Sequence, residues 1–182
     1  MHRARPGDDR PGIGQCAQGA VVGGLSLGGY LSLAFNIAHP ERVAGLALCD
    51  TGPGYRRPEG RESWNRLAEG RARHFEKHGL KSLENHPLTH GGEHKSPRGL
   101  ALAARGILPQ HDARVIDSLP YISVPTLVLV GEHDERFLAP TDYMADRIPG
   151  ATKVILEGAG HNANVDEPEA FNAALRAFLS TF

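Results

Sequence analysis

The stretch AVVGGLSLG at residues 20–28 decides the fold of this 182-residue chain. Residues 20–24 are apolar and predict a short buried strand, and the apolar spacing over residues 27–38 predicts a helix. Between them lies a G-x-S-x-G pattern, which is typical of a sharp strand-to-helix turn that exposes a serine hydroxyl. Small residues suit such a turn because it brings backbone segments close together. Ser26 is therefore a candidate nucleophile. The alternative is a serine that only begins a helix in a glycine-rich turn.

Three further apolar runs predict strands that alternate with helices. The strands are predicted at residues 43–49, 126–130 and 152–156, and the helices at residues 61–78, 98–108, 140–147 and 168–182. Continuous apolar strands that alternate with helices are typical of a parallel sheet with helices on its faces. The predicted fold class is therefore α/β, with a parallel sheet of about four strands covered on both faces.

The last predicted helix carries two local signals. Asp166 and Glu169 have the spacing of a capping box, with Pro168 at an early position of the helix. Helical spacing predicts that four apolar side chains of this helix face the sheet, namely those of Phe171, Leu175, Phe178 and Leu179.

The composition divides the chain into three kinds of segment. Residues 1–19 are rich in Gly, Pro, Arg and Asp and predict a disordered or irregular segment. Residues 20–54 and 119–182 hold the predicted strands and form the core. Residues 55–118 are charged and rich in histidine, hold no strand-like run, and predict a helical lid insertion.

Charge and cysteine content exclude several classes of protein. The net charge is -1 and the pI is about 6.8, so we expect neither nucleic acid nor a membrane as partner. Two cysteines are too few for a disulfide scaffold, which indicates a cytoplasmic protein. His86, His90 and His94 repeat every four residues, but Pro87 and Gly91 would break a helix carrying all three. We therefore predict no metal site.

Three chemically distinct side chains each follow a predicted strand. Ser26, Asp134 and His161 are placed so that the carboxyl edge of a parallel sheet would gather them. A histidine can accept the serine proton near neutral pH, and a carboxylate can fix the histidine tautomer. Asp50 also follows a strand and is the alternative acid, while Glu132 and Glu135 are rivals within the same turn as Asp134.

Four segments carry a resemblance to a known family. They are VVGGLSLGGYLSL (21–33), RVAGLALCDTGPG (42–54), VPTLVLVGEHDERF (124–137) and GAGHNANVDEPEAFNAALRAFL (158–179). Together they resemble the C-terminal part of an α/β-hydrolase of the cofactor-free esterase, enol-lactonase and perhydrolase branch. The resemblance implies Ser26 as nucleophile, Asp134 as acid and His161 as general base, with the Leu27 backbone N–H as an oxyanion donor. It also implies that residues 55–118 cover the pocket, that the substrate is a small ester or lactone, and that no cofactor is used.

The chain departs from that family before the serine. A complete member carries about four more strands there, and an early His-Gly loop that supplies a second oxyanion donor. The 25 residues before Ser26 contain neither feature. The chain is therefore expected to be a truncated gene product, or a half-sheet that self-associates through strand 20–24. A non-catalytic binding protein or fragment, and a perhydrolase, are the alternative functions.

Overall fold

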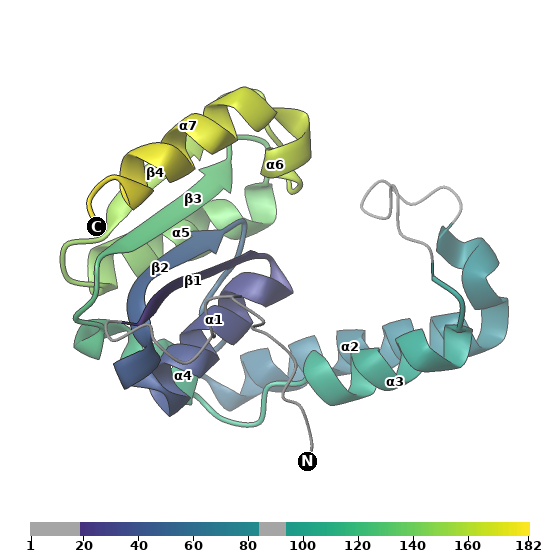
Figure 1. The fold of residues 1–182 in the computed structure, drawn as a ribbon. Coiled ribbons are helices and arrows are strands. Elements are labelled where there is room, and N and C mark those ends of the chain that lie inside the picture. The colour runs from purple at the N-terminus through teal and green to yellow at the C-terminus, as the bar shows by residue number, and fades with distance from the viewer. Residues whose placement is uncertain (1–18, 84–93) are drawn as a thin grey trace, which may run out of the picture.

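The computed structural model describes residues 19–83 and 94–182 (Figure 1). The predicted irregular segment 1–19 therefore lies outside the described residues, except for Gly19. The strands are β1 (Ala20–Leu25), β2 (Val43–Cys49), β3 (Thr126–Gly131) and β4 (Thr152–Leu156). The helices are α1 (Leu27–Ala38), α2 (Pro58–His78), α3 (Pro97–Ile107), α4 (Arg114–Ser118), α5 (Glu135–Arg147), α6 (Ala163–Asp166) and α7 (Pro168–Leu179). Short 3-10 helices span Pro40–Arg42, Gly79–Leu83 and Leu119–Tyr121.

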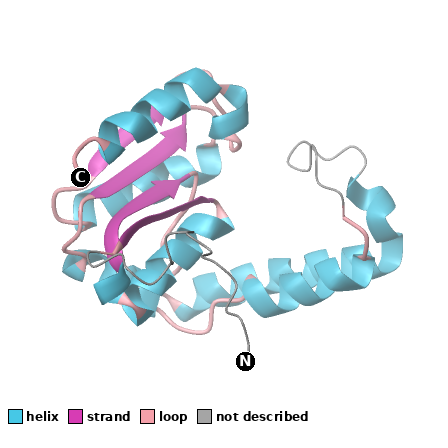
Figure 2. Cartoon of the chain, in the orientation of Figure 1, coloured by secondary structure: helices cyan, strands magenta, loops and turns pink. Residues whose placement is uncertain are grey.

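The four strands form one parallel sheet in the order β1-β2-β3-β4 (Figure 2). This confirms the predicted α/β class and the parallel sheet of about four strands. The carboxyl ends of the strands lie at one edge of the sheet, where Leu25 pairs with Cys49 and Gly131 with Leu156. The loops that carry the candidate residues leave the sheet at this edge.

Helices cover both faces of the sheet, as predicted. Leu46 and Leu48 of β2 pack on one side with residues of α1, α4 and α5, and Ala47 and Cys49 pack on the other side with residues of α6 and α7. Successive side chains of a strand point to opposite faces, so β2 contributes to both clusters. Two buried clusters, one on each side of the sheet, therefore hold the strands in place, beneath the helices that Figure 1 shows on the two faces.

Burial of the outer strands differs from the prediction. The central strands β2 and β3 are almost entirely buried, but no residue of β1 is fully buried and only Leu156 of β4 is. The prediction of a buried strand at residues 20–24 was therefore wrong, because in the described part of the chain β1 has a neighbour on one side alone. Self-association through this strand stays a prediction.

The helix that follows Asp134 begins earlier than expected. The sequence predicts a helix from residue 140, but α5 begins at Glu135. The Asp134 carbonyl accepts hydrogen bonds from the N–H groups of Phe137 (2.8 Å) and Leu138 (3.2 Å), which start the helix directly after the turn. Pro140 lies in the second turn of α5, where a proline removes one backbone donor and lowers the stability of the helix.

The start of the last helix also differs from the prediction. Asp166 belongs to the short helix α6, and its carboxylate accepts a hydrogen bond from the Gly160 N–H (2.8 Å). Glu167 is the N-cap of α7 and makes no side-chain capping bond, so the predicted capping box does not form. Phe178 is buried against the sheet with Phe171 and Leu175 beside it, whereas Leu179 is 43% exposed.

Helices α2 and α3 pair into an arm that extends from the core (Figure 1). Three buried alanines line their contact, and Arg105 of α3 forms ion pairs with Glu69 and Glu76 of α2. Near the core, the Trp64 indole N–H donates to the Leu108 carbonyl (2.8 Å). Asn65 exchanges hydrogen bonds of 2.8 and 3.0 Å with the Gln110 backbone. Within residues 19–83 and 94–182, no helix has the length and apolar character needed to cross a membrane.

Candidate active site

Ser26 lies at a strained turn between β1 and α1. Its φ and ψ are 55° and −118°, a left-handed φ that costs a residue other than glycine on the order of 1–3 kcal/mol. Gly24 and Gly28 approach so closely that a Cβ on Gly24 would lie 2.5 Å from the Gly28 carbonyl carbon. The Ser26 N–H donates to the Cys49 carbonyl (2.9 Å), so the turn is tied to β2. These contacts explain the small residues of the G-x-S-x-G stretch.

Thr51 supports this turn, although the sequence pattern did not predict a role for Thr51. Its hydroxyl donates to the Ser26 carbonyl at 2.6 Å, and the residue is only 2% exposed. Gly29 makes room for it, because a Cβ there would lie 2.5 Å from the Thr51 methyl carbon. A hydroxyl residue directly after a buried strand was the available signal, but sequence alone does not show which backbone group it contacts.

The structure brings Ser26, Asp134 and His161 together. His161 Nε2 lies 3.0 Å from the Ser26 Oγ, and His161 Nδ1 lies 2.8 Å from the Asp134 Oδ2. The side chains of His161 and Asp134 are 19% and 7% exposed, so both are largely shielded from water. When Nδ1–H donates to the carboxylate, the Nε2 lone pair is directed at the serine hydroxyl. This arrangement can move the serine proton to the imidazole.

The Phe137 ring stacks on the His161 ring, with 5.2 Å between centroids and 20° between planes. Phe137 lies in the first turn of α5, three residues after Asp134. One short segment thus supplies both the carboxylate and the apolar surface that restrict the imidazole. No local sequence pattern predicts this contact, because Phe137 and His161 approach only when β3 and β4 pair.

Backbone hydrogen bonds join the turn after β3 to the loop that carries His161. The Glu132 N–H donates to the Leu156 carbonyl and the His133 N–H to the Ala159 carbonyl, both at 2.9 Å. Gly131 permits this close approach, because a Cβ there would collide with the carbonyls of Ala159 and Gly160. The two loops therefore hold the carboxylate and the imidazole in one fixed relation.

The rival acids have other partners or positions. The Glu132 carboxylate accepts from the Gly158 N–H at 3.0 Å, and Glu135 lies exposed in the first turn of α5. Asp50 is fully buried, and its Oδ1 accepts from the Gly131 N–H at 2.8 Å. Asp134 is thus the carboxylate that accepts the hydrogen bond of His161 Nδ1, while Asp50 links β2 to β3 beneath the site.

Burial raises the pKa of the Asp50 carboxyl from 3.8 to about 6. The Gly131 and Ala163 N–H groups act in the opposite direction, as does His161, while the nearby negative charge of Asp134 raises the pKa further. Its Oδ2 has no hydrogen-bond partner in the described part of the chain. An unpaired buried oxygen disfavours the ionised form, which accounts for the direction of the shift.

We expect Asp50→Asn to remove a pH dependence of stability. The folded chain holds the Asp50 proton more tightly than the unfolded chain, whose carboxyl has its ordinary pKa of 3.8. The free energy of unfolding should therefore fall as the pH rises from about 4 to about 6, by up to about 3 kcal/mol, and stay level above that range. Chemical denaturation at pH 4, 6 and 8 should show this fall in the parent and its loss in the variant. The same slope in both proteins would contradict the prediction.

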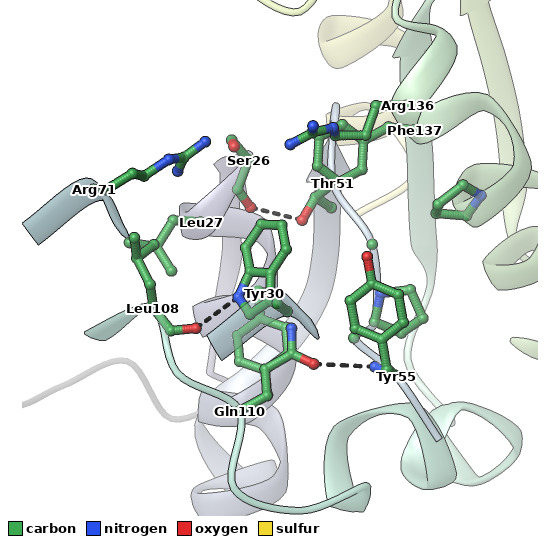
Figure 3. Close-up of a pocket in the computed structure, with 15 residues that line it drawn as sticks. Ser26, Leu27, Tyr30, Thr51, Tyr55, Arg71, Leu108, Gln110, Arg136 and Phe137 are labelled. Carbon is green, nitrogen blue, oxygen red and sulfur yellow. Dashed lines mark hydrogen bonds between the residues drawn. The ribbon is translucent and has the colours of Figure 1, made fainter. Parts of the chain in front are cut away.

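A cavity of about 140 Å³ lies beside Ser26 (Figure 3). Its walls include Leu27, Trp64, Leu108 and Phe137, so residues from the start of α1, from the arm and the loop after it, and from α5 all contribute. The Leu27 N–H begins α1 and has no backbone acceptor among residues 19–83 and 94–182. A free amide at a helix N-terminus can donate to developing negative charge.

The metal interpretation of the histidine repeat is largely outside the described residues. His86 and His90 lie there, and His94 alone is described. Within residues 19–83 and 94–182, no group of three or more His, Cys, Asp or Glu side chains has an arrangement that could hold a metal ion.

Comparison with known proteins identifies the family of this chain. A family model described as the alpha/beta hydrolase family matches residues 6–174. The chain therefore belongs to the alpha/beta hydrolase family, as the four resembling segments predicted.

Individual relatives share about a quarter to a third of the sequence. A Bacillus subtilis (strain 168) protein, provisionally named 2-succinyl-6-hydroxy-2,4-cyclohexadiene-1-carboxylate synthase, is 27% identical over 87% of this chain and 65% of its own length. A thermophilic esterase from Thermogutta terrifontis is 34% identical with a TM-score of 0.70, over 90% of this chain and 65% of its own. The enol-lactonase from Burkholderia xenovorans LB400 is 27% identical with a TM-score of 0.65, over 90% and 66%. The chain thus spans about two thirds of the length of these relatives.

Proposed function

We propose that this chain is a serine hydrolase that cleaves a small carboxylic ester or lactone through a covalent acyl-enzyme. The observation that carries the proposal is the continuous hydrogen-bond path from the Ser26 Oγ through the His161 ring to the Asp134 carboxylate. The esterase and enol-lactonase among the similar structures support the same class of substrate.

The proposed reaction has two acyl-transfer steps. The Ser26 Oγ attacks the substrate carbonyl while His161 Nε2 takes the serine proton, and the Leu27 N–H donates to the oxyanion. Collapse of this intermediate breaks the bond to the leaving oxygen, which takes the proton from His161. Water then attacks the acyl-enzyme with His161 as base, and the acid product leaves as Ser26 regains its proton.

A fluorophosphonate probe tests the proposal directly. We expect the 182-residue chain to gain one phosphonyl adduct in its intact mass, and peptide mapping to place that adduct on Ser26. The matched control is Ser32→Ala, which removes a buried serine of α1 whose hydroxyl donates to the Gly28 carbonyl (2.8 Å). This variant should label like the parent. A folded chain that takes no label would overturn the proposal and favour a non-catalytic binding protein.

A further inference from the structure

Two arginines from separate elements line the cavity beside Ser26. Arg71 belongs to α2 of the arm, and Arg136 to the first turn of α5. In Figure 3 both side chains extend toward Ser26 from opposite sides. Among the described residues, no aspartate or glutamate lines this cavity. The described part of its wall therefore carries two positive charges and no carboxylate.

Neither arginine has a side-chain partner in the part of the chain that the structure describes. Within residues 19–83 and 94–182, Arg71 and Arg136 form no ion pair and no side-chain hydrogen bond. The contrast with Arg73, two residues along the same helix, is direct, because its Nε lies 2.9 Å from a Glu69 carboxylate oxygen. All five N–H donors of each guanidinium are thus open to a ligand.

The same two arginines also line a second hollow. A second hollow of about 640 Å³ lies along the arm and shares four residues with the cavity at Ser26, namely Leu27, Arg71, Leu108 and Arg136. Its wall adds Arg66 and His74, and the described residues that line it include no carboxylate. Both arginines are exposed residues that stand where the two hollows meet, so a carboxylate bound there would stay partly solvated.

We propose that the substrate of Ser26 is an ester or lactone that bears a carboxylate, and that Arg71 and Arg136 bind this carboxylate. The proposal rests on the proposed hydrolase function and specifies its substrate class. Guanidinium groups pair with carboxylates through two parallel hydrogen bonds, which fixes orientation as well as charge. Because Arg71 lies on the arm and Arg136 on the core, a bound carboxylate would also hold the arm over Ser26.

Two esters of matched length test the charge preference. 4-Nitrophenyl hydrogen glutarate carries a terminal carboxylate, and 4-nitrophenyl valerate has a methyl group in its place. We expect the parent to prefer the glutarate ester in kcat/KM by about tenfold, as two partly solvated charge pairs would give. The ratio of the two kcat/KM values should fall to about one in the Arg71→Gln/Arg136→Gln double variant, and should decline with added salt. Arg73→Gln is the matched control and should keep the parent ratio.

A binding measurement separates this proposal from the hydrolase proposal. Calorimetry of the Ser26→Ala variant with glutarate monomethyl ester and with methyl valerate needs no turnover. We expect binding of the glutarate ester alone, and its loss when Arg71 and Arg136 are also replaced by glutamine. Equal binding of both esters, no binding of either, or a preference that survives the double replacement would overturn the carboxylate proposal. Failure of fluorophosphonate labelling would overturn the hydrolase proposal alone.

Discussion

Replacement of Ser26 by alanine is expected to lower ester turnover by on the order of 10⁴-fold or more. The substitution removes the attacking oxygen, and loss of a serine nucleophile in a hydrolase of this type costs up to about 10⁶-fold in kcat. The site has room for alanine, because alanine differs from serine only by the missing hydroxyl, which in the parent lies 3.0 Å from His161 Nε2. Initial rates with a 4-nitrophenyl ester, with the folded state checked by circular dichroism, provide the measurement.

The matched control for this prediction is Ser32→Ala, as in the labelling experiment. Ser32 lies in α1, the helix that begins directly after Ser26. Its hydroxyl donates a hydrogen bond to the Gly28 carbonyl and not to His161. Its variant should retain turnover within a few-fold of the parent. Turnover that survives in Ser26→Ala would show that another group performs the reaction, and the proposed mechanism would then be wrong.

Replacement of Asp134 by asparagine is expected to lower kcat by on the order of 10³–10⁴-fold. Asparagine has nearly the same shape, but its amide removes the negative charge that stabilises the protonated imidazole. If its NH₂ group faces Nδ1, His161 is also held in the tautomer that has its proton on Nε2. The serine proton would then have no acceptor at the 3.0 Å contact. Steady-state kinetics across pH 5 to 9 provide the measurement.

Two further aspartate variants are compared with Asp134→Asn, one as a surface control and one to test the alternative acid. Asp142→Asn is the matched surface control, because Asp142 is exposed on α5 and pairs with Lys153 (2.9 Å). It should leave kcat within twofold of the parent. The rival outcome is that Asp50→Asn abolishes turnover while Asp134→Asn retains it. That outcome would assign the acid to Asp50 and contradict the role proposed for Asp134.

Local sequence predicted most of the sheet and the helices, because apolar periodicity is a property of short segments. Residues 43–49 and 126–130 are continuous apolar runs, and they form the two buried central strands. The same signal misjudged residues 20–24, since an apolar run does not show whether a strand has one neighbour or two. It also missed the start of α5 at Glu135, because hydrogen bonds to the Asp134 carbonyl outweigh the proline signal at residue 140.

The sequence predicted which three side chains come together at the candidate site, but not the residues that hold them in position. Ser26, Asp134 and His161 each follow a strand, so a parallel sheet alone predicts that they gather at one edge. Thr51 and Phe137 act through contacts between loops that are distant in sequence, and no local pattern encodes those contacts. The unpaired state of the pocket arginines likewise depends on which carboxylates the fold brings near, which sequence does not show.

Hydrogen bonds position Asp134 and His161 as one unit and Ser26 as another. The first unit fixes the orientation of the imidazole, and the second fixes where the serine hydroxyl lies. Asp134 and His161 belong to loops that are hydrogen-bonded to each other, so the orientation of the imidazole is set within one unit. Ser26 is hydrogen-bonded to Cys49, the last residue of β2, and to Thr51 just after that strand. The distance from its hydroxyl to His161 therefore depends on how β2 pairs with β3. A change in the packing between β2 and β3 would therefore alter how often the Ser26 hydroxyl lies within hydrogen-bond distance of His161 Nε2. The arrangement of His161 and Asp134 would stay the same.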